Sequence, residues 1–180
     1  RAEYGILGVR TTLDFERMFQ LAAPGHTIKL MDTYIPNPPR KFRKALRKAV
    51  SKGVRIQVLL SLPGSAFARQ RARECGDEYA QQGHFTHGIL TFAKQLLEAD
   101  PDGASVCIKF YANYAAQPQY LATHGDEAYL ALTSIFLGTA SRHSPHLEWQ
   151  RDIATRSTFL DDFHAYFQEH WNDPAHYTIA

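Results

Sequence analysis

Residues 124–141 combine a histidine, a glycine and small polar side chains with two apolar runs, and such a set could act on a bound ligand. His124 precedes Gly125 in a predicted turn, and a histidine can accept or donate a proton near neutral pH. Residues 127–132 alternate between polar and apolar and residues 135–137 are all apolar, so we expect two adjacent strands separated by a polar turn. Gly138 then lets the backbone approach a ligand closely. This interpretation places His124 at a strand entrance and Gly138 at a strand exit.

The spacing of these residues resembles the signature of the phospholipase D superfamily, His-x-Lys-x4-Asp-x6-Gly-Ser-x-Asn. Without gaps, the histidine of the signature falls on His124 and the glycine on Gly138. The remaining positions are substituted, and in chain order they hold Asp126, Ala131, Thr139 and Ser141. Glu148, on the next predicted strand, is similar in position to the family's later acidic residue.

The resemblance implies a site for phosphoryl chemistry. In the family the histidine attacks phosphorus, and a second copy of the motif supplies the acid for the leaving group. The lysine neutralises the phosphoryl oxygens and small polar residues donate to them, so Gly138, Thr139 and Ser141 are the implied ligand contacts. Arg142 is a candidate cation beside them. Asp126 stands where the family has lysine, so a carboxylate would face the anionic phosphoryl group. Two like charges about 4 Å apart repel by about 1 kcal/mol in water and about 4 kcal/mol near a protein surface.

Glu148 has two interpretations. The resemblance implies that its carboxylate points at the site and holds His124 in one tautomer. From the residues alone, it is equally a surface carboxylate near Arg151.

Metal and thiol chemistry have little support in the sequence. His84 and His87 form an H-x-x-H pair that could bind zinc, but no third ligand follows nearby, so we predict no metal site and no cofactor. Cys75 and Cys107 lie far apart without a CxxC pattern, and we expect two free thiols in a reducing, cytoplasmic setting.

A helix with one basic face lies between two predicted strands, 27–32 and 54–60. The three elements form a strand-helix-strand unit with a parallel sheet, which also resembles the front half of a phospholipase D-type domain. The basic face is either a solvated surface or a contact for a phosphate-rich partner, nucleic acid or an anionic membrane. Its residues are Arg40, Lys41, Lys44, Arg47 and Lys48, with Arg43 and Lys52 beside them.

Length and charge limit the remaining choices. The 180 residues suffice for one domain, and the start at Arg1 suggests a piece of a longer protein. No apolar run approaches the roughly 18 residues of a membrane span. Residues 1–60 hold 12 Lys and Arg against 4 Asp and Glu, a charge of +8, and residues 61–180 hold 8 against 14, a charge of −6. One end of the domain should therefore attract anions.

Further periodic segments complete the expected fold. We predict helices over 66–82, 89–99 and 158–171, and strands over 105–111 and 147–154. The last helix has an aromatic face that ends at Trp171. With the resemblance, these elements imply a single α/β domain, a three-layer α-β-α phospholipase D-like fold with a mixed β-sheet.

Two functions follow from the altered signature. The first is a catalytically degenerate phospholipase D-like domain that acts as a regulatory, phosphate-ligand-binding or dimerisation module rather than as an enzyme. The alternative is an active phosphodiesterase or nuclease that uses His124 through a covalent phosphohistidine at a dimer interface. Because one motif copy is present, the resemblance implies a homodimer or a second phospholipase D-like half.

Overall fold

The computed structural model describes residues 6–11, 15–33, 40–75, 83–112, 119–124, 127–134, 145–149, 159–175 and 177–179. The strands are β1 (Ile6–Arg10), β2 (Thr27–Asp32), β3 (Arg55–Ser61), β4 (Val106–Tyr111), β5 (Gln119–His124), β6 (Glu127–Ser134), β7 (His146–Trp149) and β8 (Tyr177–Ile179). The helices are α1 (Phe15–Leu21), α2 (Arg40–Ser51), α3 (Ala66–Cys75), α5 (His84–Leu97) and α6 (Phe159–Asn172). In this part of the chain every helix is too short or too polar to cross a bilayer.

The strands form one mixed sheet in the order β1-β7-β6-β5-β2-β3-β4-β8. The central strands β2, β3 and β4 run parallel to one another, and every other neighbouring pair is antiparallel. A parallel pair needs a long crossover, and α2 supplies it between β2 and β3. The sequence prediction of a mixed sheet built on this unit is confirmed.

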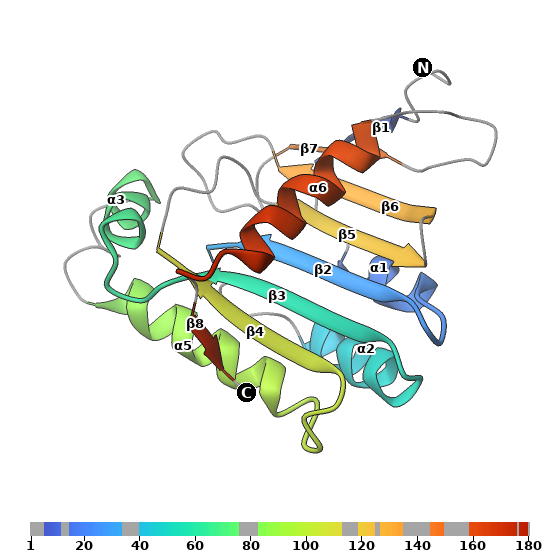
Figure 1. Cartoon of the computed structure of the whole chain (residues 1–180), viewed down its shortest axis with the longest axis horizontal. Coiled ribbons are helices and arrows are strands. Elements are labelled where there is room, and N and C mark those ends of the chain that lie inside the picture. The colour runs from blue at the N-terminus through green and yellow to red at the C-terminus, as the bar shows by residue number, and fades with distance from the viewer. Residues whose placement is uncertain are drawn as a thin grey trace.

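Helices cover both faces of the sheet, which gives three layers (Figure 1). Alternate residues of a strand point to opposite faces, and on β2 Ile28 and Leu30 belong to one core while Met31 belongs to the other. The first core also takes buried side chains from α1, α2 and α5, and the second takes them from α6, which crosses β2 and β5 in Figure 1. The predicted α-β-α architecture is confirmed.

Two lysines lie on the face of the sheet that α6 covers. Lys29 Nζ lies 3.1 Å from His164 Nδ1 and 5.4 Å from the centre of the Phe167 ring. Lys109 donates to the carbonyl oxygen of Trp171 at 2.7 Å and lies over its ring. Burial lowers the pKa of Lys29 below its usual 10.5. The ammonium groups of both lysines thus contact aromatic ring faces and polar atoms of α6, which covers this core.

The start of helix α5 and the presence of strand β8 differ from the sequence prediction. Helix α5 begins at His84 rather than Ile89, directly after Gly83, whose φ of 66° is a conformation that glycine adopts without strain. Strand β8 was not predicted, because three residues are too few for a periodic signal, and its pairing with β4 comes from tertiary contact.

Candidate functional site

The strands around His124 are arranged differently from the prediction. His124 is the last residue of β5, so its placement at a strand entrance is wrong. Strand β6 runs without interruption through Thr133 and Ser134, where we expected the turn, because these residues pair with β5 on one side and β7 on the other. Ladder pairing on both sides outweighs the turn preference of these small polar residues. The connection between the two strands is residues 125–126.

The end of β5 lies far from the end of β6. Thr123 faces Thr27 at the start of β2, which puts His124 at the amino edge of the parallel strands. Glu127 faces His124, and Ser134 lies seven residues further along, or about 23 Å at the rise of a strand. The predicted ligand contacts Gly138, Thr139, Ser141 and Arg142, together with Asp126, lie outside the described residues. A catalytic role for His124 stays a prediction.

Glu148 lies on β7 as predicted, but it is not a surface carboxylate. Its side chain is 2% exposed, and its Oε1 lies 2.5 Å from Nη1 of Arg17 on α1. Glu148 pairs with Leu132, which pairs with Tyr120, four residues before His124 and about 13 Å away along the strand. The structure therefore brings Glu148 to Arg17 and not to His124.

Buried polar side chains gather instead at the opposite edge of the sheet, where β2, β3 and β4 end and β5 begins. In open α/β sheets this carboxyl edge is the usual place for ligands, because loops diverge there. Helix α3 closes it, with Ala68 and Ala72 in one core and Phe67 packed against the other (Figure 1). We call this group the carboxyl-edge cluster, and it consists of Asp32, Thr33, Ser61, Arg71, Tyr111, Gln119 and Tyr120.

Asp32 is fixed at the centre of the carboxyl-edge cluster. Its Oδ1 accepts a hydrogen bond from the backbone N–H of Thr33 at 2.6 Å, and its Oδ2 accepts one from the hydroxyl of Tyr120. Tyr120 reaches Asp32 because β5 runs antiparallel beside β2. Two donors therefore hold a buried carboxylate in one orientation.

Tyr111 ends β4 on the α6 face and keeps its proton. Burial raises the pKa of Tyr111 well above its usual 10.0, and the negative charge of Asp32 raises it further. A hydrogen bond with Thr33 and the positive charge of Arg71 act in the opposite direction and are smaller. The phenol is thus a neutral hydrogen-bond donor across the physiological range.

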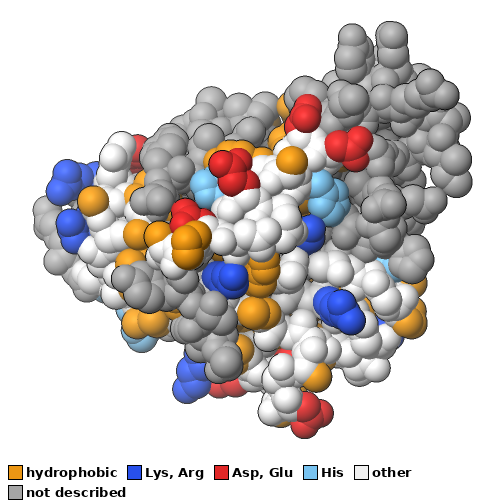
Figure 2. All heavy atoms as spheres, viewed as in Figure 1, with side chains coloured by type: hydrophobic (Ala, Val, Ile, Leu, Met, Phe, Trp, Pro, Cys, Tyr) orange, Lys and Arg blue, Asp and Glu red, His pale blue; other side chains and the backbone are white. Residues whose placement is uncertain are grey.

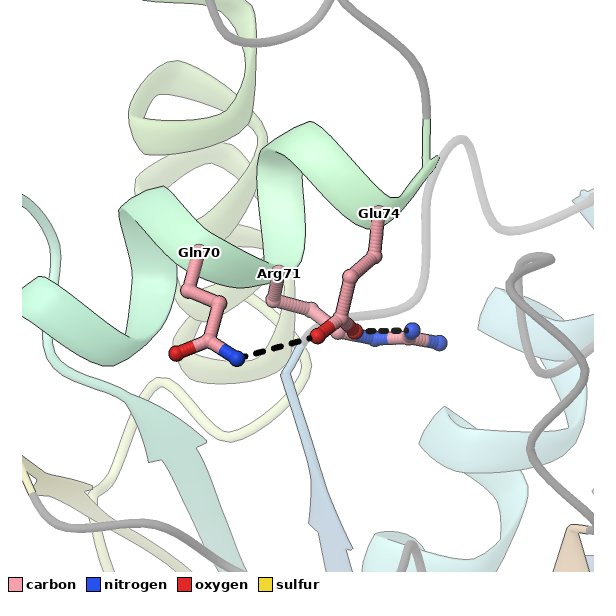
Figure 3. Close-up of polar contacts among 3 residues, drawn as sticks. All are labelled: Gln70, Arg71 and Glu74. Atoms are coloured by element: carbon pink, nitrogen blue, oxygen red, sulfur yellow. Dashed lines mark hydrogen bonds and ion pairs between the residues drawn. The ribbon is translucent and has the colours of Figure 1, made fainter.

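Arg71 brings a positive charge to the carboxyl-edge cluster from α3. The residue is 5% exposed, and its Nη1 lies 2.8 Å from Oε2 of Glu74 one turn later. Figure 3 shows the Glu74 carboxylate between this guanidinium and the amide of Gln70, whose Nε2 donates to Glu74 Oε1 at 3.2 Å. Glu74 itself is exposed, so water screens its ion pair with Arg71. The Arg71 guanidinium could therefore also contact an anionic ligand.

Two polar atoms of the carboxyl-edge cluster lack a hydrogen-bond partner within the described part of the chain. They are Oγ of Ser61, whose residue is fully buried, and Oε1 of Gln119, whose residue is 3% exposed. Both residues lie on the α6 face, with Ser61 paired to Tyr111 and Gln119 paired to Met31. Buried groups of this kind normally have a partner, so a ligand or ordered water would satisfy them.

Similar folds occur among solved structures, although no protein-family model and no curated protein sequence matches the chain. The phospholipase D family member Nuc from Salmonella typhimurium superposes with a TM-score of 0.54 at 12% identity, over 91% of this chain and 88% of that one. The chain has the phospholipase D fold. Phosphatidylserine synthase of Haemophilus influenzae Rd KW20 gives a TM-score of 0.55 at 10% identity, and polyphosphate kinase of Porphyromonas gingivalis gives 0.52 at 13%.

The two enzymes are much longer than the phospholipase D fold seen here. The match covers 91% of this chain and 36% of the phosphatidylserine synthase chain, and 89% of this chain and 23% of the polyphosphate kinase chain. The resemblance stated from residues 124–148 and from the strand-helix-strand unit is confirmed at the level of the fold.

Metal chemistry gains no support from the described portion of this phospholipase D fold. No group of three or more potential ligands gathers there. His84 and His87 are both exposed in the first turn of α5, and Nε2 of His87 lies 3.3 Å from the hydroxyl of Thr91. Cys107, on β4, is a free thiol as predicted.

Sequence reasoning missed the carboxyl-edge cluster. Asp32 follows an apolar strand directly, which is the signal that could have marked it, since polar residues at the ends of parallel strands meet at one edge. Arg71 and Tyr120 gave no such signal, because a helical arginine and a strand tyrosine are ordinary residues until tertiary contacts bury them beside Asp32.

Proposed function

We propose that the chain is a catalytically degenerate phospholipase D-like domain that binds a phosphate-containing ligand at the carboxyl-edge cluster and serves as a regulatory or dimerisation module. The fold is that of phosphodiester-processing proteins, and the hairpin of β5 and β6 carries the argument for degeneracy.

The pairing of β5 with β6 suggests where the signature belongs. Its histidine and its Gly-Ser pair serve one phosphoryl group, so they should occupy facing positions of a hairpin. In the signature the glycine follows the histidine by 14 residues, and the facing pair Gln119 and Thr133 has this separation, since 133 − 119 = 14. Moved five residues earlier, from 124 to 119, the signature places its histidine at Gln119, its lysine at Leu121 and its serine at Ser134.

Neither of the two essential side chains is present in this register. Gln119 cannot form a phosphohistidine, and Leu121 is fully buried in the core beneath α6. The absence of the signature's histidine and lysine supports a binding role, in which Ser61, Tyr111 and Arg71 would donate hydrogen bonds to a bound phosphate.

Inorganic phosphate should bind the chain and raise its melting temperature, and Ser61→Ala should weaken this binding about 10-fold or more. A hydrogen bond to a charged group is worth about 1.5–3 kcal/mol. The Ser61 hydroxyl makes no hydrogen bond among the described residues, so its removal should weaken ligand binding without breaking a hydrogen bond of the described fold. Isothermal titration calorimetry at pH 7 measures the affinity. Ser51→Ala is the matched control, because Ser51 lies exposed on α2 and, among the described residues, its hydroxyl donates to the carbonyl oxygen of Lys48. Equal affinity in Ser61→Ala and the wild type would contradict a ligand at this cluster.

A homodimer, or assembly with a second phospholipase D-like half, is the second part of the proposal. It rests on the single copy of the signature-like stretch in the sequence. Light scattering on the isolated chain should give twice the 20.4 kDa mass of the chain. A monomer at high micromolar concentration would contradict the homodimer and leave assembly with a second phospholipase D-like half as the remaining form of this part of the proposal.

The alternative function, a phosphodiesterase or nuclease acting through His124, requires two copies to bring two His124 imidazoles to one pocket. Both functions allow phosphate binding, so a measurement of phosphodiester hydrolysis distinguishes them and a measurement of binding does not.

A further inference from the structure

Helix α2 presents an uncompensated positive surface that the proposed phosphate site does not use. All its cations are exposed, the helix contains no acidic residue, and none of them pairs with a carboxylate in the described stretches. Lys52 and Arg55 extend the surface beyond the helix end, and both are exposed as well. The α2 cations are Arg40, Lys41, Arg43, Lys44, Arg47 and Lys48.

This arrangement destabilises the helix on its own. Arg40 and Lys44, Arg43 and Arg47, and Lys44 and Lys48 are like-charged pairs four residues apart. Each such pair costs roughly 0.2–0.5 kcal/mol, and cations in the first turn also oppose the helix dipole. A solvated face that only needed solubility would mix the two signs of charge. An anionic partner would relieve this repulsion.

The apolar side of α2 is already buried in the protein. Phe42, Leu46 and Ala49 belong to the core between α2 and the sheet, and Phe42 packs edge-on against Phe19. A helix that lies in a membrane surface inserts its apolar face into the lipid, and α2 has no such face left. No aromatic side chain is exposed on α2, which also excludes it as a stacking surface for single-stranded bases.

Negative charge lies on the opposite side of the sheet. Figure 2 shows the α6 face, where acidic side chains gather along α6. Asp161 and Asp162 in the first turn of α6 are exposed, and so is Glu169. The acidic residues of α6 and the basic face of α2 thus lie on opposite sides of the sheet, which would favour approach of a polyanion from the α2 side.

We propose that the exposed face of α2 binds the phosphate backbone of double-stranded nucleic acid without reading its sequence. The twelve residues of α2 span about 18 Å. Each strand of duplex DNA carries one phosphate per about 3.4 Å of the axis, so a helix of this length runs beside about five phosphates of one strand and can contact about four of them. Cations without aromatic or amide side chains beside them fit backbone contact and not base recognition.

The test measures binding of the chain to a fluorescent 20-base-pair duplex by anisotropy at several salt concentrations. With about four phosphates neutralised, affinity should fall about 100-fold between 50 and 200 mM salt. Lys44→Glu combined with Arg47→Glu should abolish binding at 50 mM. The control is Arg73→Glu combined with Lys94→Glu, which makes the same change in net charge at exposed positions of α3 and α5 and should keep the duplex affinity within about 3-fold.

Unfolding would not explain a loss in the α2 variant. The two reversals replace like-charged pairs with opposite pairs, so the melting temperature measured by circular dichroism should not fall. Absence of duplex binding by the wild type at 50 mM salt would overturn the proposal. So would equal loss in the control, which would indicate general charge, or binding to phosphatidylserine vesicles without binding to the duplex, which would indicate a membrane surface.

Discussion

The isolated chain is expected to hydrolyse no generic phosphodiester above the buffer rate. A phospholipase D-type site needs a nucleophilic histidine and a cation beside the phosphoryl group. Loss of one preorganised electrostatic contact, such as the one made by this cation, costs about 10²- to 10³-fold in rate. In the proposed hairpin register these positions hold Gln119 and Leu121, and both contributions would then be missing. Absorbance of p-nitrophenol released from bis(p-nitrophenyl) phosphate at pH 7 measures the rate.

Substitutions decide between the two functions if turnover is found. The degenerate function predicts that His124→Ala and Gln119→Ala both leave the baseline unchanged. Turnover in the wild type that disappears in His124→Ala would establish the alternative, with another cation in place of the missing lysine. Turnover that survives His124→Ala but disappears in Gln119→Ala would place an unforeseen reaction at the carboxyl-edge cluster.

Phe167→Ala should lower the free energy of unfolding by about 3–5 kcal/mol, the usual cost of removing a buried aromatic ring. Phe167 is fully buried, stacks on Trp171 with ring centres 5.8 Å apart, and lies against the Lys29 ammonium. Its loss leaves a cavity under α6 and removes the ring that the ammonium faces. Urea unfolding followed by circular dichroism measures the change.

Glu169→Ala is the matched control on the same helix. Glu169 is exposed, and substitutions at such positions usually change stability by less than about 0.5 kcal/mol. A loss below about 1 kcal/mol for Phe167→Ala would mean that α6 does not hold this core together in solution.

Local patterns were sufficient to predict the strand-helix-strand unit of β2, α2 and β3. Apolar residues recur at helical spacing in α2, and Phe42, Leu46 and Ala49 are buried as that spacing requires. Gly53 ends the segment with a φ of 80°, which is the conformation that makes glycine a helix stop. These features depend on residues close in sequence, which is why they could be read from it.

The register of the β5–β6 hairpin could not be predicted in the same way. An alternating strand gives no mark of where its pairing begins, and Thr133 and Ser134 have turn-forming side chains that the ladder overrides. The contact of Glu148 could not be predicted for a related reason. Nothing near Glu148 in the sequence indicates that its partner is Arg17, 131 residues earlier. The fold was therefore predictable from local patterns and the resemblance, while the positions that decide the site depended on long-range pairing.

The edges of the sheet have a consequence for how the chain is made. Strand β1 pairs with β7, so residues 6–10 leave the ribosome long before residues 146–149 exist to complete their ladder. Until then the edge of β1, with Val9 exposed even in the folded protein, can pair only with the wrong strand or with another molecule. The β2–α2–β3 unit can form meanwhile, because its contacts are local. Contacts of high sequence separation come last, and the time before they form is when the nascent chain is most exposed to aggregation.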